Sequence, residues 1–303
     1  MKILIAGGSG MIGRAATAAL RADGHAVVQL VRREAASGEE LAWYPAAGEL
    51  PLESCRTADA VINLCGADIA AKRWTRKRRH EIRSSRIDTT QTLAKIFGDA
   101  RHRPAVFVSA SATGIYGDRG NLELNESSGP GNGFLADLCR DWEGAAMTAA
   151  ESGARVACLR FGAVLSREGG ILQRVVPFYR AGFGCALGTG RQWLSWIGLE
   201  DAVGAIRFAL GEAGLSGPVN VVSPTSVMNA VFTRALGRIF GHQLPMAVPR
   251  IALEMMYGPI TDEVLLASAH VVPSKLLRSG YPFRYPNLED ALYQALAMEK
   301  SEG

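Results

Sequence analysis

The feature that most constrains the fold is a cluster of glycines near the start of the chain, in the run Gly7-Gly8-Ser9-Gly10-Met11-Ile12-Gly13. The apolar residues 2–6 before it are typical of a buried strand, and small and apolar residues recur after it at helical spacing. Glycine permits a tight turn and a close approach of backbone to backbone. The run therefore predicts a strand that passes directly into a helix.

The same alternation of strand and helix continues along the chain. We expect further strands at residues 26–31, 58–64, 104–109, 155–160 and 217–222, and a helix at 86–97. Strands separated by helices predict an α/β fold with a doubly wound, Rossmann-type parallel sheet. We expect this domain to cover residues 1–235, with the segment 166–197 contributing to the substrate side. Residues 236–303, rich in proline and without that alternation, are expected to form a small, mainly helical C-terminal lobe.

The glycine run also predicts a ligand. It matches G-x-G-x-x-G from Gly8, in the strand–turn–helix context that gives this pattern its meaning. The N-terminus of a helix supplies unpaired N–H groups and the positive end of a dipole, which together suit a pyrophosphate. The dinucleotide site is expected to include Gly7, Ser9, Gly10, Met11, Ile12 and Gly13.

The residues after the second strand favour one cofactor over another. A carboxylate there would hold the ribose hydroxyls of NAD, but the sequence reads Val31-Arg32-Arg33. A carboxylate would repel the 2′-phosphate of NADP(H). Guanidinium groups instead pair with a phosphate, often through two hydrogen bonds. The expected cofactor is NADP(H). The alternative is that these are surface arginines that simply close the strand.

Motifs along nearly the whole chain resemble the extended short-chain dehydrogenases/reductases. Within them the chain is similar to an atypical, NAD(P)-dependent epimerase/dehydratase-like family often labelled nucleoside-diphosphate-sugar epimerase. Besides the glycine run, the motifs lie at residues 63–66, 72–75, 85–90, 109–117, 141–143, 190–193, 272–277 and 283–286. The last two resemble the family's C-terminal domain of unknown function.

The resemblance implies roles for particular residues. It puts Arg32 near the 2′-phosphate and implies that further cofactor contacts come from Leu64, Cys65, Gly66, Glu81, Arg86 and Val164. For Cys65 it implies contact through the backbone rather than redox chemistry. On the substrate side it implies Arg191, Gln192, Trp193 and Trp196, although tryptophans grouped in this way are also typical of a protein core.

The usual catalytic pair of such enzymes, Tyr-x-x-x-Lys, is absent. No tyrosine is followed four residues later by lysine, and no lysine lies between Lys95 and Lys275. We expect Tyr116 to donate a proton instead, with Ser109 or Ser111 polarising a substrate carbonyl, because this segment leaves the carboxyl end of a strand. The alternative is that Tyr116 forms a packed wall of the pocket.

Charge and composition limit the partners. The net charge of +4 arises from residues 72–86, which hold eight basic residues and one acid, so the rest of the chain is acidic. This segment is either a solvated helix face or a rim that attracts anions, and it is too local to predict nucleic-acid binding. We expect no membrane span, no metal site and no disulfide, since the five cysteines form no Cys-x-x-Cys pair. We therefore expect a cytoplasmic location. The sequence does not distinguish a monomer from a homodimer.

The polar, glycine-rich residues 117–133 predict a long loop rather than a helix or strand, and loops of this length are often lids. Taken together, the sequence predicts an NADP(H)-binding oxidoreductase or epimerase that acts on a small carbonyl- or sugar-type molecule. The alternative is a non-catalytic NADP(H)-binding redox sensor or scaffold.

Overall fold

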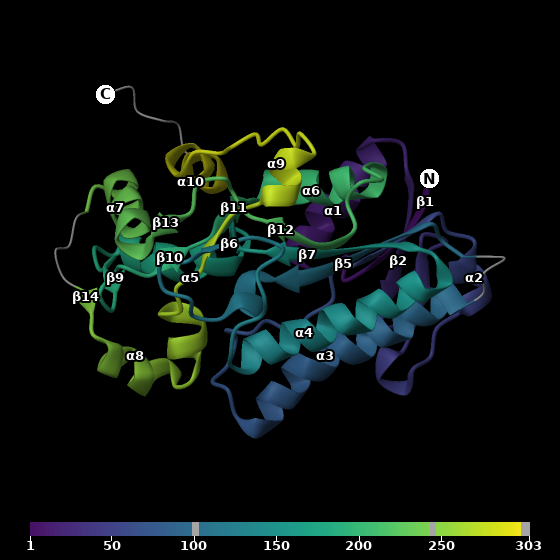
Figure 1. Ribbon diagram of the computed structural model, residues 1–303, viewed down its shortest axis with the longest axis horizontal. Helices are drawn as coiled ribbons and strands as arrows, with labels where there is room; N and C mark the ends of the chain where they lie inside the picture. Colours follow the sequence, from purple (N-terminus) through teal and green to yellow (C-terminus); the bar gives the residue numbers. More distant parts are fainter. Residues whose placement is uncertain (99–102, 243–246, 298–303) are drawn as a thin grey trace. The chain divides into compact units, whose positions relative to one another are not determined.

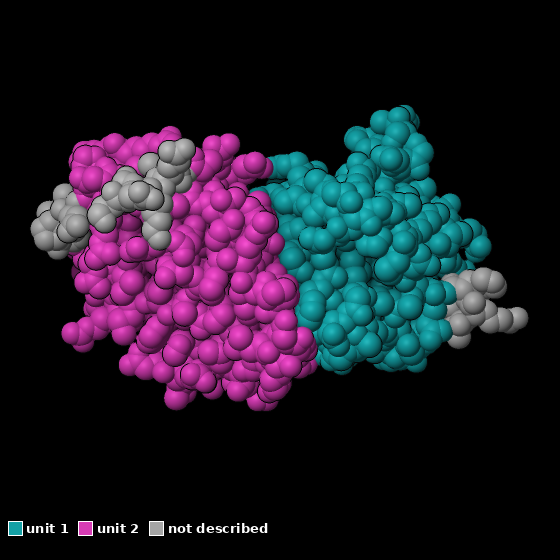
Figure 2. All heavy atoms as spheres, turned by 90° about the horizontal axis from the view of Figure 1, so that it is seen from above, with its two compact units in different colours: residues 1–111, 138–160, 203–219 teal, residues 112–137, 161–202, 220–303 magenta. Residues whose placement is uncertain are grey.

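The computed structural model describes residues 1–98, 103–242 and 247–297, whose contacts group into two compact units. Unit 1 comprises Met1–Ser111, Leu138–Arg160 and Val203–Val219, and unit 2 comprises residues 112–137, 161–202 and those from 220 onward (Figure 2). The chain passes from one unit to the other several times. The division into domains expected at residue 235 stays a prediction.

A seven-stranded sheet, most of it in unit 1, confirms the doubly wound prediction. Its spatial order is β12 (Gly217–Val221), β7 (Arg155–Phe161), β5 (Val106–Ala112), β4 (Ala60–Asn63), β1 (Lys2–Ala6), β2 (Ala26–Val31) and β3 (Glu40–Ala42). The β1–β2, β1–β4, β2–β3 and β4–β5 pairs are parallel. From β1 the chain builds outward through β2 and β3, and from β4 it builds in the opposite direction. A crevice is expected where the order reverses, beyond the carboxyl ends of β1 and β4.

Helices cover both faces of this sheet (Figure 1). On one side α3 (Arg76–Ala94) and α4 (Phe134–Met147) run next to each other, joined by an ion pair of 2.6 Å between Arg83 and Asp141. On the other side lie α1 (Met11–Ala22) and α6 (Leu199–Gly211), where Arg207 binds Asp23 at the end of α1. The remaining short helices of unit 1 are α2 (Leu52–Arg56), η1 (Pro45–Ala47), η2 (Lys95–Gly98) and η4 (Thr148–Ser152).

Each unit contains a cluster of buried apolar side chains. In unit 1, Leu4, Val61 and Phe107 of the central strands pack with Trp43 and Phe97. The strands are apolar on both faces because helices cover both sides of a parallel sheet. In unit 2, the core is built from Leu165, Leu172, Trp196, Phe232, Leu236, Leu288 and Leu292.

Unit 2 is made of short strands and helices, and its C-terminal part is mainly helical, as expected. Its strands are β6 (Glu123–Leu124), β8 (Ala163–Ser166), β9 (Ala186–Leu187), β10 (Trp193–Leu194), β11 (Trp196–Gly198), β13 (Val227–Met228), β14 (Ala247–Val248) and β15 (His270–Val271). Its helices are η3 (Thr113–Tyr116), α5 (Gly170–Arg180), α7 (Asn229–Phe240), α8 (Arg250–Tyr257), the π-helical turn η5 (Thr261–Leu265), α9 (Ser274–Arg278) and α10 (Leu288–Leu296). No helix in the described part of the chain is long and apolar enough to cross a membrane.

Two expectations about local structure need correction. Helix α3 begins at Arg76 rather than at 86, because the side chain of Thr75 caps it by accepting a hydrogen bond from the Arg78 amide at 3.1 Å. The first turns of this helix are rich in basic residues, so they show no apolar periodicity that would predict a helix. Residues 117–133 contain the strand β6, which pairs in parallel with β15.

The segment 117–133 is also tied down by hydrogen bonds inside unit 2. The Arg119 amide donates to the Ser268 carbonyl at 2.8 Å, and the Ser268 hydroxyl donates to the Gly120 carbonyl at 2.7 Å. Glu126, which is 7% exposed, accepts from the amides of Asn220 and Lys275. A lid movement would have to break these bonds, so a lid role for this segment stays a prediction that its contacts do not favour.

We predict that Asp201 is a main source of stability in unit 2. This carboxylate is 2% exposed and accepts from the Arg284 amide at 2.7 Å and the Tyr285 amide at 2.9 Å. Asp201→Ala leaves both amides without a hydrogen-bond acceptor. It should therefore lower the free energy of unfolding, measured in urea, by about 3 kcal/mol. Glu200→Ala is the control, because it removes two exposed contacts, the ion pair with Arg284 and the hydrogen bond from the Gln294 side chain, and should cost less than about 1 kcal/mol. Equal losses for the two variants would contradict this account.

Candidate functional site

A pocket of about 530 Å³ lies in unit 1 at the reversal of strand order. The glycine turn, the ends of β2 and β4, and two residues of α3 contribute to it. Its lining residues are Gly7, Gly8, Ser9, Gly10, Gln29, Leu30, Val31, Arg32, Arg33, Glu40, Trp43, Leu64, Cys65, Gly66, Ala67, Ser85 and Thr89. This is the position where open α/β sheets bind ligands.

Steric contacts explain the spacing of the glycines. Gly7 has φ +84°, and a Cβ there would lie 2.6 Å from the carbonyl carbon of Leu64. A Cβ on Gly13 would lie 2.1 Å from the Gly7 carbonyl oxygen. Both glycines are needed for the turn itself. Gly10 differs, because a Cβ there would meet only the Gly7 oxygen, at 3.4 Å.

The open space at Gly10 and the start of α1 suit a pyrophosphate. Ser9 and Gly10 are exposed, and Gly10 is the N-cap of α1 without a side-chain cap. The first turn of α1 holds no acidic residue that would repel an anion. The helix therefore presents its N-terminal N–H groups and dipole to the pocket, and a dinucleotide fits this arrangement.

The two arginines after β2 differ in their availability. Arg33 forms two hydrogen bonds with Glu40, of 2.7 and 2.6 Å, and these bonds lower the pKa of the Glu40 carboxyl to about 2. The guanidinium of Arg33 is thus occupied at neutral pH. Arg32 is exposed and has no hydrogen-bond or ion-pair partner among the described residues. One unpaired guanidinium therefore lines the pocket.

Arg86 stabilises the segment after β4 by contacts that lie outside the pocket lining. Its guanidinium donates to the Ala67 carbonyl at 3.0 Å and lies 5.2 Å from the ring centroid of Trp142, and its burial lowers its pKa. A Cβ on Gly66 would lie 3.0 Å from it. Burial also raises the pKa of the Cys65 thiol to about 12, so the thiol stays neutral at physiological pH. A neutral thiol suits a backbone contact better than redox chemistry.

Several residues expected to bind the cofactor lie elsewhere. Arg86 is not among the described lining residues of the pocket, and neither is Glu81, which pairs with Arg78 at 3.1 Å. Met11, Ile12 and Gly13 form the first turn of α1, next to the pocket lining. Val164 belongs to β8 in unit 2. Contact of these six residues with a cofactor stays a prediction. Lining residues that the sequence did not reveal include Gln29, Glu40, Trp43, Ser85 and Thr89.

A buried charged cluster lies at the carboxyl ends of β5 and β7. The hydroxyl of Ser111 donates to Glu143 Oε1 at 2.7 Å. Arg160 binds the same carboxylate with Nε at 2.7 Å and Nη2 at 2.8 Å. Ser111 and Arg160 are 3% and 6% exposed. Arg160 therefore acts as the structural tie that strand-end arginines usually form, and Glu143 fixes the direction of the Ser111 hydroxyl.

Ser109 belongs to a different, fully buried network. Its hydroxyl lies 3.3 Å from Nδ2 of Asn63, which also donates to Thr90 Oγ1 at 2.8 Å. The indole N–H of Trp142 donates to the same Thr90 oxygen at 2.9 Å. Ser109 is 0% exposed. These bonds join β4, β5, α3 and α4, so Ser109 has a structural role in unit 1.

Tyr116 is enclosed within unit 2. It is 0% exposed, and its hydroxyl lies 2.7 Å from Oδ1 of Asn220 and 2.9 Å from the Asn125 carbonyl oxygen. The Asn220 amide group in turn donates to the Val272 carbonyl at 2.9 Å. The single phenolic proton is therefore used inside the protein. A proton-donor role for Tyr116 stays a prediction, and this geometry favours the packed wall instead.

The four residues expected on the substrate side differ in their exposure and in whether their polar groups already have partners inside the protein. Trp196 is 0% exposed in the core of unit 2, and its indole N–H donates to the Thr225 carbonyl. Gln192 donates to the carbonyls of Leu187 and Leu265.

Trp193 and Arg191 are more accessible. The ring of Trp193 stacks on His270 at 4.1 Å, and its N–H donates to Asn121. Arg191 is exposed, and its side chain has no partner in the described chain. Of the four, Arg191 alone keeps a free polar group. The described residues also contain no cluster of three or more His, Cys, Asp and Glu side chains suited to a metal ion.

Comparison with known proteins identifies the family. The model of the "NAD dependent epimerase/dehydratase family" matches residues 3–222, and that of a "Domain of unknown function (DUF1731)" matches residues 248–295. The chain belongs to the NAD dependent epimerase/dehydratase family. The resemblance read from its motifs is thereby confirmed, including the C-terminal domain.

Individual relatives agree with this assignment over nearly the full length. An epimerase family protein of Mycobacterium bovis is 44% identical, with 96% of each chain covered. The crystal structure of the human epimerase family protein SDR39U1 with NADPH is 31% identical, with a TM-score of 0.89 over 98% of this chain and 99% of that one. A nucleoside-diphosphate sugar epimerase from Corynebacterium glutamicum is 33% identical, with a TM-score of 0.80 over 100% of this chain and 59% of that one.

The glycine turn yields a prediction that separates folding from binding. Gly13→Ala forces a methyl group against the Gly7 carbonyl and should lower the free energy of unfolding by about 3 kcal/mol. Gly10→Ala should change stability by no more than about 1 kcal/mol. It should nevertheless weaken NADPH binding at least tenfold, because its methyl group occupies the space at the helix N-terminus. Unchanged NADPH affinity of Gly10→Ala in calorimetry would show that phosphate does not bind there.

Proposed function

We propose that this protein binds NADP(H) in the pocket of unit 1 and uses it as an oxidoreductase or epimerase. The observation that carries the proposal is the unpaired guanidinium of Arg32, directly after β2, beside an arginine already neutralised by Glu40. A 2′-phosphate would give Arg32 the partner that it lacks. The human relative crystallised with NADPH supports the same cofactor.

The cofactor would supply hydride exchange with a carbon of the substrate, and the chain must then handle a proton. We assign this task to Ser111. Its own proton points to Glu143, so its lone pairs are free to accept a hydrogen bond from a substrate hydroxyl. When the substrate alcohol is oxidised, its proton passes to Ser111 Oγ while the Ser111 proton moves to Glu143. Reduction of a carbonyl follows the reverse path.

Arg160 limits where that proton can go. It holds the Glu143 carboxylate with two hydrogen bonds in a buried position, so the carboxylate cannot turn away from Ser111. The substrate class that fits this chemistry is a small secondary alcohol or carbonyl compound, including a sugar.

A second candidate function is a non-catalytic NADP(H)-binding sensor or scaffold. It is favoured by the absence of Tyr-x-x-x-Lys and by the enclosed hydroxyls of Tyr116 and Ser109. Incubation with NADPH deuterated at the transferred position, over a panel of ketones and sugar nucleotides, separates the two. Deuterium in a product, or formation of a new epimer from a sugar nucleotide incubated with NADP⁺, supports the enzyme, and the absence of both with every compound supports the sensor.

Cofactor choice provides a direct prediction. NADPH should bind at least tenfold more tightly than NADH, a difference of about 1.4 kcal/mol. Arg32→Ala should remove this preference, because it should weaken the binding of NADPH and leave the binding of NADH unchanged. The double variant Arg33→Gln/Glu40→Gln removes the neighbouring pair without changing the net charge and should keep the preference. Calorimetry that finds equal dissociation constants for the two cofactors in the wild type would refute the proposal.

The proton path can be tested with paired variants. Ser111→Ala should lower turnover by about 10²–10⁴-fold with NADPH affinity little changed. Tyr116→Phe leaves Asn220 without its hydroxyl partner, so it should lower the free energy of unfolding by about 1–3 kcal/mol and change turnover far less. If Tyr116→Phe abolishes turnover in a stable protein while Ser111→Ala is active, Tyr116 is the proton donor after all.

A further inference from the structure

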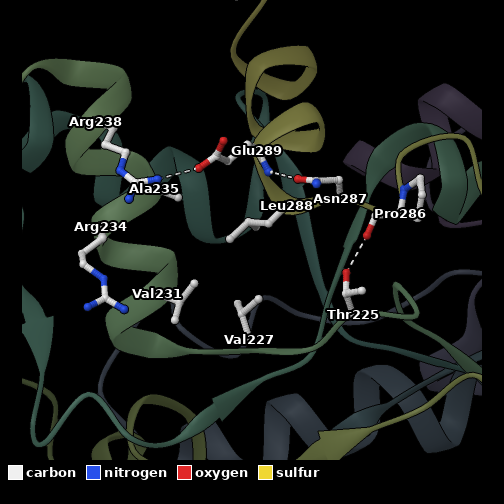
Figure 3. Close-up of a pocket in the computed structure, with 10 residues that line it drawn as sticks. All are labelled: Thr225, Val227, Val231, Arg234, Ala235, Arg238, Pro286, Asn287, Leu288 and Glu289. Atoms are coloured by element: carbon white, nitrogen blue, oxygen red, sulfur yellow. Dashed lines mark hydrogen bonds and ion pairs between the residues drawn. The ribbon is translucent and has the colours of Figure 1, made fainter.

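A second pocket, of about 780 Å³, lies within unit 2 and shares no lining residue with the dinucleotide pocket. Figure 3 shows it between the face of α7 that carries Val231 and Arg234, the segment at Thr225 and Val227, and the start of α10. Its volume falls in the range of pockets that bind small molecules. Nothing in the proposed redox chemistry uses it.

The floor of this pocket is apolar. It is formed by Val227, Val231, Ala235 and Leu288, of which Ala235 and Leu288 belong to the core of unit 2. Val231 is 38% exposed, although most valines are buried. An apolar ligand group placed on this floor would remove such surface from water.

Of the three charged side chains around the floor, two are paired with each other. Arg238 pairs with Glu289 at 3.0 Å, and the Asn287 side chain accepts from the Glu289 amide at 3.0 Å (Figure 3). The Thr225 hydroxyl donates to the Pro286 carbonyl. Arg234, one turn before Arg238 on α7, has no hydrogen-bond or ion-pair partner in the parts of the chain that are described. The charged side chains that line the pocket are two arginines and one glutamate, so the pocket has an excess positive charge.

We propose that this pocket binds a small amphipathic anion, a carboxylate attached to an aromatic or aliphatic body. The body lies on the apolar floor, and the carboxylate pairs with Arg234, whose planar guanidinium matches the two carboxylate oxygens. A neutral ligand would leave Arg234 unpaired. A dianion could pair only one of its two negative charges, because Arg238 already forms an ion pair with Glu289. This inference does not depend on the proposed redox function.

The test compares 4-phenylbutanoate with its uncharged amide, 4-phenylbutanamide, by calorimetry and ligand-observed NMR on the full chain. The acid should bind with a dissociation constant at or below about 1 mM, at least fivefold more tightly than the amide. Arg234→Gln should bring the two affinities within about twofold of each other. Val231→Glu, which puts a negative charge on the floor, should weaken the acid still further.

Two controls separate this site from general charge and from the cofactor pocket. Arg180→Gln removes an exposed arginine at the end of α5 that does not line the pocket, and it should leave the preference for the acid unchanged. NADPH affinity and the melting temperature should be the same in Arg234→Gln as in the wild type. The proposal is overturned if the acid shows no saturable binding up to about 10 mM, if acid and amide bind alike in the wild type, or if Arg234→Gln behaves like Arg180→Gln.

Discussion

The close packing of the first turn is the constraint on which the dinucleotide pocket depends. The Gly7 carbonyl oxygen lies where a Cβ on Gly13 would be, and Gly7 itself is pressed against the end of β4 at Leu64. These contacts hold the N-terminus of α1 close to the loop after β4, and the pairing of β1 with β2 places the arginines after β2 at the same pocket. Only a chain without side chains at these two positions can make the turn so tight. The electrostatics of the pocket, from the helix dipole to Arg32, follow from this arrangement.

The sequence predicts this part of the protein well because its signals are local. Strands β1 and β2 have the expected bounds, and Gly7, Gly10, Arg32 and Cys65 all line the pocket. What it misses depends on tertiary contacts. Whether Arg32 or Arg33 is free is decided by Glu40, which belongs to the unpredicted strand β3. The placement of Arg86 behind the pocket lining has no local signal either.

The partners of the hydroxyl groups near the end of β5 also depend on tertiary contacts, for the same physical reason. Ser109 and Ser111 are two residues apart on one strand and look alike in sequence, but one meets an asparagine and the other a carboxylate. That difference comes from Glu143 on α4, held in turn by Arg160 on β7. The sequence leaves open whether Tyr116 is a proton donor or a packed wall, and the hydrogen-bond acceptor of its hydroxyl, Asn220, lies more than a hundred residues later. A buried polar group needs a partner, and the sequence does not show which partner it finds.

The central claim is that Arg32 binds the 2′-phosphate of NADP(H). Phosphorus NMR of bound NADP⁺ across pH 4–8 tests it directly, because the phosphate monoester has a second pKa of about 6 and its resonance shifts on protonation. A guanidinium partner favours the dianion, so the pKa of the bound 2′-phosphate should lie below that of free NADP⁺ in the wild type. It should return to the free value in Arg32→Ala, at cofactor concentrations that saturate the protein. The same titration in both proteins would contradict the account.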